Sequence, residues 1–257
     1  MAKSKRILCI PDTQCKPDVD LSYMTAIGRY IADKQPDVIV HLGDAVDFPS
    51  LSSYDKGKRS FEGRRLRADL EAGHEGMERL VLPMRELQER QRANKKKVYN
   101  PRMVLTLGNH EQRLDRLAND TPELAEFIGT EMLNYEQYGF EVFPFLKAVE
   151  IDGIFFVHYL SNPFTGKPYG GTALNQLKTV GRSFVVGHKQ TLDIAMRPTL
   201  DGKTQFGIIA GACYDFHEEY KGEHNNHFRG VVMLHEVSDG NALPMPVSLE
   251  YLKSKYL

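Results

Sequence analysis

The chain is poor in cysteine and in long apolar runs. Its 257 residues include only three cysteines, Cys9, Cys15 and Cys213, and their spacing follows no pattern. An odd, unpatterned set does not support a disulfide framework and favours a reducing compartment. No apolar run approaches the roughly 18 residues that cross a bilayer, and residues 7–10, after the basic N-terminus, are too few for a secretory signal. We therefore expect a cytoplasmic protein without membrane contact.

The chain also lacks a strong net charge. It carries −1 at neutral pH, with 41% hydrophobic and 26% charged residues, as ordinary globular proteins do. A bulk electrostatic attraction to nucleic acid or membrane is therefore excluded. Neither a Walker A loop nor a Gly-x-Gly-x-x-Gly fingerprint is present, so nucleotide binding by those routes is unsupported.

One segment departs from this neutral average. Residues 55–97 are helix-prone and contain 13 Lys and Arg against 8 Asp and Glu, a local charge of +5 that leaves −6 for the rest of the chain. Basic clusters lie at residues 56–67 and 90–97. Two interpretations are open: a solvated helical insertion, or a basic cap that grips the phosphate backbone of DNA or RNA. Phe61 is the only aromatic residue in the segment, so stacking on single strands is not supported.

Short apolar runs that end at proline or glycine indicate buried strands. Residues 7–10, 38–42 and 103–107 form such runs, and residues 21–34 have the apolar periodicity of a helix. A strand, a helix and a strand in this order normally give parallel neighbours. Further helices are expected at residues 111–117 and 122–133, and further strands at residues 145–151, 154–157, 184–186, 206–210 and 231–236.

These elements predict an α/β fold. Two β-sheets packed face to face as a β-sandwich, with helices outside, would accommodate the order of strands and helices. Asp152-Gly153 between two of the strands predicts a hairpin turn. We expect a single domain over residues 1–257, with a charged helical insertion at about residues 51–98.

Polar side chains that can bind metals follow several of the predicted strands. The motifs are Pro11-Asp12-Thr13-Gln14, Gly43-Asp44-Ala45-Val46-Asp47, Gly108-Asn109-His110-Glu111 and Gly187-His188-Lys189-Gln190, and His158 directly follows the run at 154–157. Ligand sites in open α/β sheets collect beyond the carboxyl ends of strands, so these groups are expected to converge. Because residues two apart on an extended segment point the same way, Asp12 with Gln14, and His188 with Gln190, either share one metal pocket or divide between two.

Phosphate esters resist attack because their oxygens repel nucleophiles and the leaving alkoxide is poor. Two divalent cations about 3.5–4 Å apart neutralise those oxygens and turn a bridging water into hydroxide near neutral pH. Such a centre needs one carboxylate that bridges the ions and a separate ligand set for each. The four motifs contain groups of both kinds.

In this order, the motifs resemble those of the calcineurin-like metallophosphoesterase superfamily. The resemblance covers about residues 6–190 and rests mainly on Gly-Asp-x-x-Asp and Gly-Asn-His-Glu. It implies the four-layer metallophosphoesterase-like fold, a metal-dependent hydrolase and a phosphate-ester substrate. It further implies that Asp12 binds the first metal, that Asp44 bridges both, and that Asn109, His158 and His188 bind the second. The Asp-x-Gln form at residues 12–14 resembles phage-encoded members.

The resemblance also implies roles beside the metals. His110 would stand at the leaving-group side as proton donor or transition-state stabiliser. Asp47 would orient His110 or a neighbouring strand, and Glu111 would support the site from behind the ligands. We therefore expect His110, Asp44 and Asp47 to carry the catalysis.

The chain departs from the family pattern at Gln14 and Gln190, where the family generally has histidines of the first metal site. With Asp12, Asp44 and these two amides, that site becomes all-oxygen, and such ligands favour Mn²⁺ or Mg²⁺ over Zn²⁺ or Fe. We expect two divalent ions, Mn²⁺ first and Mg²⁺ as the alternative, with the first ion held more loosely. In the alternative interpretation, the two amides bind water in a one-metal site.

Other polar residues favour structural interpretations. His41 reads as a core or supporting histidine, and Arg113 as a partner in an ion pair more than a phosphate ligand. His217, His224 and His227 read as a polar loop that lines the substrate cleft more than as a metal site.

Three functions compete. A nuclease or phosphodiesterase is favoured slightly by the basic segment, with metal-activated hydroxide attacking in line. A phosphomonoesterase or protein phosphatase is the alternative, and a non-catalytic phosphate-binding scaffold is the third. The Asn109-His110 pair argues against the scaffold.

Overall fold

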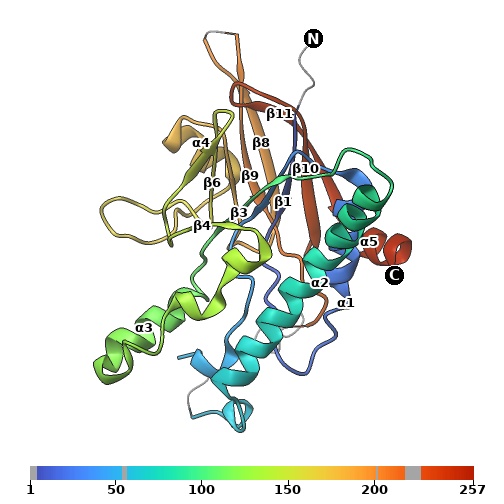
Figure 1. The fold of residues 1–257 in the computed structure, drawn as a ribbon. Helices are drawn as coiled ribbons and strands as arrows, with labels where there is room; N and C mark the ends of the chain where they lie inside the picture. The colour runs from blue at the N-terminus through green and yellow to red at the C-terminus, as the bar shows by residue number, and fades with distance from the viewer. Residues whose placement is uncertain (1–4, 54–56, 201, 218–226) are drawn as a thin grey trace.

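The computed structural model describes the chain apart from residues 1–4, 54–56, 201 and 218–226. Two mixed sheets form its centre (Figure 1). The first has the order β11-β10-β1-β2-β3-β4 and consists of β1 (Lys5–Ile10), β2 (Val38–His41), β3 (Arg102–Thr106), β4 (Glu141–Phe143), β10 (Gly230–Ser238) and β11 (Asn241–Ser248). The second has the order β5-β6-β7-β9-β8 and consists of β5 (Val149–Ile151), β6 (Ile154–Val157), β7 (Phe184–Val186), β8 (Leu192–Pro198) and β9 (Thr204–Ala210).

Helices flank the two sheets. They are α1 (Ser22–Lys34), α2 (Leu66–Ala93), α3 (Gln112–Asp120), α4 (Ala173–Val180) and α5 (Leu249–Tyr256). In Figure 1, α1, α2 and α5 gather on one side of the molecule, α4 lies on the other, and α3 projects away from the sheets. Apolar side chains fill the space between the sheets, with Ile7 and Val40 from the first and Phe156 and Ile208 from the second. The predicted α/β fold with two packed sheets and flanking helices is confirmed.

The parallel strands β1, β2 and β3 position the polar residues that follow them in the sequence. β1 pairs with β2 and β2 with β3 in parallel register, as the strand–helix–strand pattern predicts. In the second sheet, β6 and β7 are also parallel neighbours. The carboxyl ends of β1, β2 and β3 therefore lie at one end of the first sheet, and those of β6 and β7 at one end of the second, where ligand sites form in such folds.

Helix α2 is part of the core as well as a charged surface. It packs along α1, and a Cβ on Gly28 would lie 2.4 Å from the carbonyl oxygen of Leu80. Its buried face includes Gly76, Met77 and Val81, so only its outer face is the solvated helix that the sequence predicts. The extent of an insertion at 51–98 stays a prediction.

The length of α2 separates the two basic clusters. Its 28 residues span about 42 Å at 1.5 Å a residue. The basic residues before α2 lie near the Asp47 loop, because the Arg64 Nη1 donates to the Pro49 carbonyl at 2.9 Å. The cluster at 90–97 lies at the far end, where Tyr99 donates to the carbonyl of Pro36. The two clusters therefore do not form one cap.

Several elements differ from the sequence predictions. The helix expected at 122–133 is two short 3₁₀ turns, Pro122–Leu124 and Thr130–Leu133, which are separated by the extended Gly129. The strand expected at 145–151 is regular only over β5. The expected hairpin is present, since β5 and β6 pair antiparallel around Asp152 (φ 50°) and Gly153 (φ 82°), as a two-residue turn requires. In the described part of the chain, no helix combines the length and the apolar content that crossing a membrane needs.

Candidate metal centre

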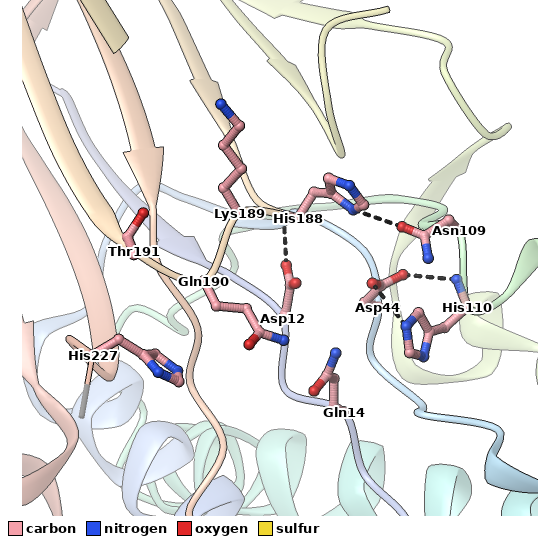
Figure 2. Close-up of a pocket in the computed structure, with 10 residues that line it drawn as sticks. All are labelled: Asp12, Gln14, Asp44, Asn109, His110, His188, Lys189, Gln190, Thr191 and His227. Atoms are coloured by element: carbon pink, nitrogen blue, oxygen red, sulfur yellow. Dashed lines mark hydrogen bonds and ion pairs between the residues drawn. The ribbon is translucent and has the colours of Figure 1, made fainter. Parts of the chain in front are cut away.

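The predicted ligands meet in one cleft at the carboxyl ends of the strands. Asp12 follows β1, Asp44 follows β2, Asn109 follows β3, His158 follows β6 and His188 follows β7. The cleft has a volume of about 500 Å³. Figure 2 shows the side chains that line it, which are those of Asp12, Gln14, Asp44, Asn109, His110, His188, Lys189, Gln190, Thr191 and His227. His158 lies behind them, fully buried.

Four of these groups make a compact set of metal donors. Ligand atoms of Asp44, His158 and His188 all lie within 4.8 Å of one another. The Asn109 Oδ1 lies 2.9 Å from the Nε2 of His158 and 2.8 Å from the Nδ1 of His188. The other ring nitrogen of His158 is 2.8 Å from the carbonyl oxygen of Leu42, and such a bond fixes the tautomer of metal-binding histidines. This mixed imidazole and oxygen set fits a divalent transition metal.

Asp12 and Gln14 leave two acceptor oxygens without a donor. One carboxylate oxygen of Asp12, Oδ1, accepts the backbone N–H of His188 at 2.9 Å. Its Oδ2 and the Oε1 of Gln14 are buried and have no hydrogen-bond partner among the described residues. A buried acceptor without a partner is costly, and a cation would satisfy both. The all-oxygen character of this position fits a hard ion such as Mn²⁺ or Mg²⁺.

His188 and Gln190 point in different directions. The N–H of Lys189 donates to the carbonyl of Gly187 at 2.7 Å around His188, whose φ is +64°. This hydrogen bond closes a strained γ-turn, so the segment is not extended. His188 turns toward Asn109 (Figure 2), whereas the Gln190 Oε1 accepts a hydrogen bond from the hydroxyl of Tyr214 at 3.0 Å. The two side chains therefore do not point the same way, and a metal-ligand role for Gln190 stays a prediction.

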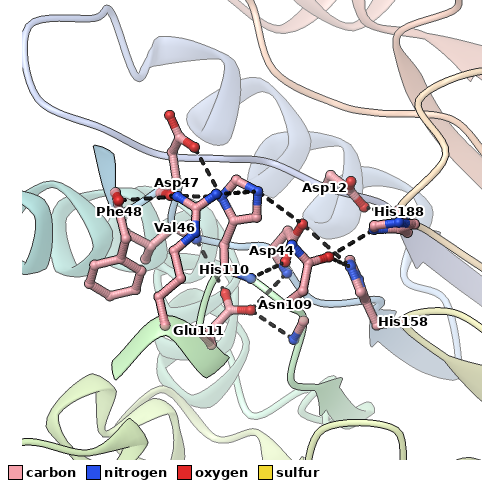
Figure 3. A network of polar contacts seen from close by, with 12 residues as sticks. Asp12, Asp44, Val46, Asp47, Phe48, Asn109, His110, Glu111, His158 and His188 are labelled. Atoms are coloured by element: carbon pink, nitrogen blue, oxygen red, sulfur yellow. Dashed lines mark hydrogen bonds and ion pairs between the residues drawn. The ribbon is translucent and has the colours of Figure 1, made fainter. Parts of the chain in front are cut away.

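His110 stands beside Asp44 and is held by the Asp47 segment (Figure 3). Its Nδ1 lies 2.7 Å from the carbonyl oxygen and 3.0 Å from the carboxylate of Asp47, and its Nε2 is 3.7 Å from the Oδ2 of Asp44. Arg113 donates to the carbonyls of Asp47 and Phe48 and has no ion pair among the described residues. It braces the segment that holds His110, which is a different structural role from the ion pair that the sequence predicts.

Glu111 builds the turn that presents Asp44. It is fully buried, and its carboxylate accepts the backbone N–H groups of Asp44, Ala45 and Gly108 at 2.7–2.9 Å (Figure 3). Asp44 itself has a left-handed backbone, with φ 49°, which is unfavourable for a residue other than glycine. Glu111 therefore ties the turn after β2 to the turn after β3 and holds Asp44 in this conformation.

The charges in the cleft are strongly coupled. Burial opposes ionisation of Asp44, but His110 and His158 outweigh it and hold the pKa of Asp44 well below its usual range. The charge of Asp44 in turn overcomes burial and raises the pKa of each of these histidines to about 9. Burial and then Asp44 raise the pKa of Asp12 to about 7, whereas burial and His158 lower that of His188 to about 4. A bound divalent cation would favour the ionised carboxylates and the neutral imidazoles of this set.

We expect Glu111→Ala to lower the free energy of unfolding by about 3 kcal/mol or more, because several buried N–H groups lose their acceptor. Glu111→Gln should lose less, since one carbonyl oxygen remains. Urea unfolding measures both. Glu150→Ala is the control, because Glu150 is exposed on β5 and such changes usually stay within about 0.5 kcal/mol. Equal stability of Glu111→Ala and Glu150→Ala would contradict this role.

Some residues of the cleft were not singled out in the sequence. Lys189 lines it from within the last motif, where it was given no role, Thr191 lines it directly after that motif, and the hydroxyl of Tyr214 donates to Gln190. His227 lines the cleft, as predicted for its loop, while His217 is exposed outside the lining and His224 lies outside the described residues. His41 is buried between Thr13 and Gly43, as expected of a supporting histidine.

The chain is similar to known proteins over most of its length. The family model described as calcineurin-like phosphoesterase matches residues 5–234. The Gene 54 protein of Mycobacterium phage L5 is 30% identical over 190 residues, which cover 72% of this chain and 69% of that protein. The Gene 54 protein of Mycobacterium phage D29 gives the same identity and coverage. Among solved structures, nuclease MPE of Pseudomonas putida aligns with 93% of this chain and 87% of its own at 12% identity, with a TM-score of 0.36.

Proposed function

Because this chain belongs to the calcineurin-like phosphoesterase family, whose members are metal-dependent hydrolases of phosphate esters, we propose that its substrates are phosphodiesters, with nucleic acid as the favoured class. The phosphomonoesterase or protein phosphatase is the alternative. The fold and the family are compatible with hydrolysis of phosphodiesters and of phosphomonoesters, so the choice between the two substrates depends on the residues around the cleft.

The observation that carries the proposal is the group of basic residues at 58–67, which lies near the segment that holds His110. Lys58, Arg59, Arg65 and Arg67 are exposed. They are tied to the cleft through Arg64, which donates to the Pro49 carbonyl just after the segment that holds His110. Cations at this place would neutralise phosphates on either side of the scissile one, as in other nucleic-acid sites. A monoester substrate offers no such neighbours.

In the proposed site, one ion is held by Asp44, Asn109, His158 and His188, and a second, looser one by Asp12, Gln14 and Asp44. When bound, divalent ions neutralise phosphoryl oxygens and activate a water molecule near neutral pH, and we propose Mn²⁺, with Mg²⁺ as the alternative. His110 acts at the leaving-group side, because its Nε2 lies 3.7 Å from the Oδ2 of Asp44, within reach of a phosphate ester bound at the metals. Asp47 orients the His110 ring through Nδ1. We further propose a cytoplasmic location, which three free, buried cysteines support.

The test compares bis-p-nitrophenyl phosphate with p-nitrophenyl phosphate under added Mn²⁺. We expect the diester to be hydrolysed with a kcat/KM at least about tenfold higher, a difference of about 1.4 kcal/mol in the barrier. Removing the metal with a chelator should abolish the activity, and adding Mn²⁺ back should restore it.

Linear DNA and salt complete this experiment. If nucleic acid is the substrate, its degradation should weaken steeply as salt rises, whereas hydrolysis of the small diester should change little. A higher kcat/KM on the monoester would favour the phosphatase. No hydrolysis of either ester would favour the scaffold and contradict the proposal.

A further inference from the structure

We propose that Gln190 is a substrate-binding residue and not a metal ligand: Tyr214 holds its amide so that the N–H₂ group faces the cleft and donates to a phosphoryl oxygen. This inference rests on the proposed function, hydrolysis of a phosphate ester in this cleft. It separates Gln190 from Gln14, although the two residues occupy matching places in their motifs.

The first step is the bond that holds the amide oxygen. The hydroxyl of Tyr214 donates to the Gln190 Oε1 at 3.0 Å. Because an amide oxygen can only accept, the phenol proton is used in this bond, and the Nε2 of His227, 3.4 Å from the same hydroxyl oxygen, donates to it when that nitrogen carries a proton. The chain His227, Tyr214, Gln190 thus runs in one direction, and it ends on the amide oxygen.

Tyr214 is a rigid donor. Its side chain is fully buried, and its ring stacks on that of Phe216 with centroids 4.6 Å apart and planes 24° apart. The guanidinium of Arg229 lies over the Tyr214 ring, 4.7 Å from its centroid. A phenol ring fixed in this way has little freedom to turn its hydroxyl elsewhere. The position of the Gln190 oxygen is therefore set by the core and not by solvent.

The consequence for the cleft follows from the shape of an amide. Its oxygen and its N–H₂ group are on opposite sides of the terminal carbon, so an oxygen that faces Tyr214 leaves the N–H₂ group toward the cleft, as Figure 2 shows. An N–H₂ group is a donor only. It suits a phosphoryl oxygen and disfavours a cation.

Gln14 lacks such an anchor: Figure 2 draws its N–H₂ group toward the cleft as well, but no hydrogen bond among the described residues holds its amide oxygen, so a half-turn of the amide presents that oxygen instead. Its Oε1 is buried without a hydrogen-bond partner among the described residues, and the Oδ2 of Asp12 is in the same state. These two oxygens are available to one ion. Both segments contain a left-handed residue, Gln14 itself (φ 45°) and His188 (φ 64°), so the difference between the two amides lies in the hydrogen bond from Tyr214 to Gln190.

The experiment compares Gln14→Met and Gln190→Met, which remove the same amide with little change of volume. The Mn²⁺ dissociation constant is measured by calorimetry on the whole chain without substrate, and kcat/KM with bis-p-nitrophenyl phosphate at saturating Mn²⁺. For Gln190→Met we expect kcat/KM to fall about 10–100-fold, the effect of a lost hydrogen bond to a charged group, and the Mn²⁺ constant to change less than about threefold. For Gln14→Met we expect Mn²⁺ binding itself to weaken about tenfold or more.

Weaker Mn²⁺ binding in Gln190→Met, of the size seen in Gln14→Met, would overturn the inference and make Gln190 a ligand. Tyr214→Phe gives a second test, because it removes only the hydroxyl. It should lower kcat/KM severalfold with unchanged Mn²⁺ binding, while Tyr138→Phe, which loses a hydroxyl that contacts His74 away from the cleft, should match the wild type. Equal kcat/KM in Tyr214→Phe and wild type would count against the positioning role. A wild-type chain that neither binds Mn²⁺ nor hydrolyses an ester would instead refute the proposed function.

Discussion

Asp44→Asn should abolish most of the metal-dependent activity, with a fall in kcat/KM of about 10³-fold or more. Asp44 is the group shared by every part of the site: its Oδ1 accepts the N–H of His110 at 2.9 Å, and its Oδ2 lies 3.3 Å from the Nε2 of His158. Asparagine keeps this shape but removes the negative charge that holds divalent ions. Charge stabilisation by metals contributes several kcal/mol to such reactions, and each 1.36 kcal/mol is tenfold in rate.

Binding and folding measurements separate this effect from a damaged protein. The Mn²⁺ dissociation constant should rise in parallel with the loss of activity. The melting temperature should stay near that of wild type, because Glu111 holds the Asp44 turn through backbone N–H groups that the substitution leaves in place. Asp152→Asn is the matched control, since Asp152 lies in the β5–β6 turn and pairs with Lys5 at the surface. Asp44→Asn with activity within tenfold of wild type would refute a shared ligand.

Elements with continuous apolar runs were the predictable part of the fold. Strands β6 and β7 begin and end at the predicted residues, because each is buried and bounded by a turn or a polar residue. Strand β11 was missed: it contains Pro244 and Pro246 and alternates exposed with buried positions. Proline is tolerated there because β11 is an edge strand of its sheet. A single sequence does not tell which strand will lie at an edge.

The site was predictable where a motif follows a strand, and not where two distant segments meet. The convergence of Asp12, Asp44 and His188 follows from the parallel strands that precede them. The contact between Gln190 and Tyr214 does not, because it depends on how the segment after β9 lies beside Asp12, where Ala212 pairs with Asp12 and the N–H of Cys213 donates to the Asp12 carbonyl. The γ-turn at His188 is equally invisible, since glycine precedes that residue but histidine adopts the positive φ.

The charged segment shows the same limit. Its helix was predictable from local propensity, which is what a sequence reports best. The burial of Gly76 and Met77 depends on the packing of α2 on α1, which local propensity does not report. So is the separation of the two basic clusters, because it follows from one uninterrupted helix that continues past Pro83.

His110→Ala should lower kcat by about 10²–10⁴-fold, the usual contribution of a positioned acid or base, and leave Mn²⁺ binding near that of wild type. His110 lies beside the ligands: its Nε2 is 3.7 Å from Asp44, and it is not part of the compact set of Asp44, His158 and His188. His217→Ala is the control, because His217 is exposed outside the cleft lining. A large loss of Mn²⁺ affinity in His110→Ala would instead make His110 a ligand.

The leaving group distinguishes the two roles that remain open for His110. A proton donor matters most when the departing oxygen is a poor leaving group, such as the alkoxide of a nucleotide, and little when it is p-nitrophenolate, which departs without a proton. If His110 donates a proton, the loss of kcat in His110→Ala should be at least about tenfold larger for an alkyl diester than for bis-p-nitrophenyl phosphate. Equal losses on the two esters would mean that the ring stabilises charge on the phosphoryl oxygens, which are the same in both. Asp47 holds the Nδ1 of His110. The Nε2 of this ring lies 3.7 Å from the Oδ2 of Asp44 and 3.3 Å from the Nη2 of Arg113. Burial opposes protonation of the ring, but Asp44 outweighs it and raises the pKa of His110 to about 9. The ring therefore carries a proton to donate, and we expect the unequal result.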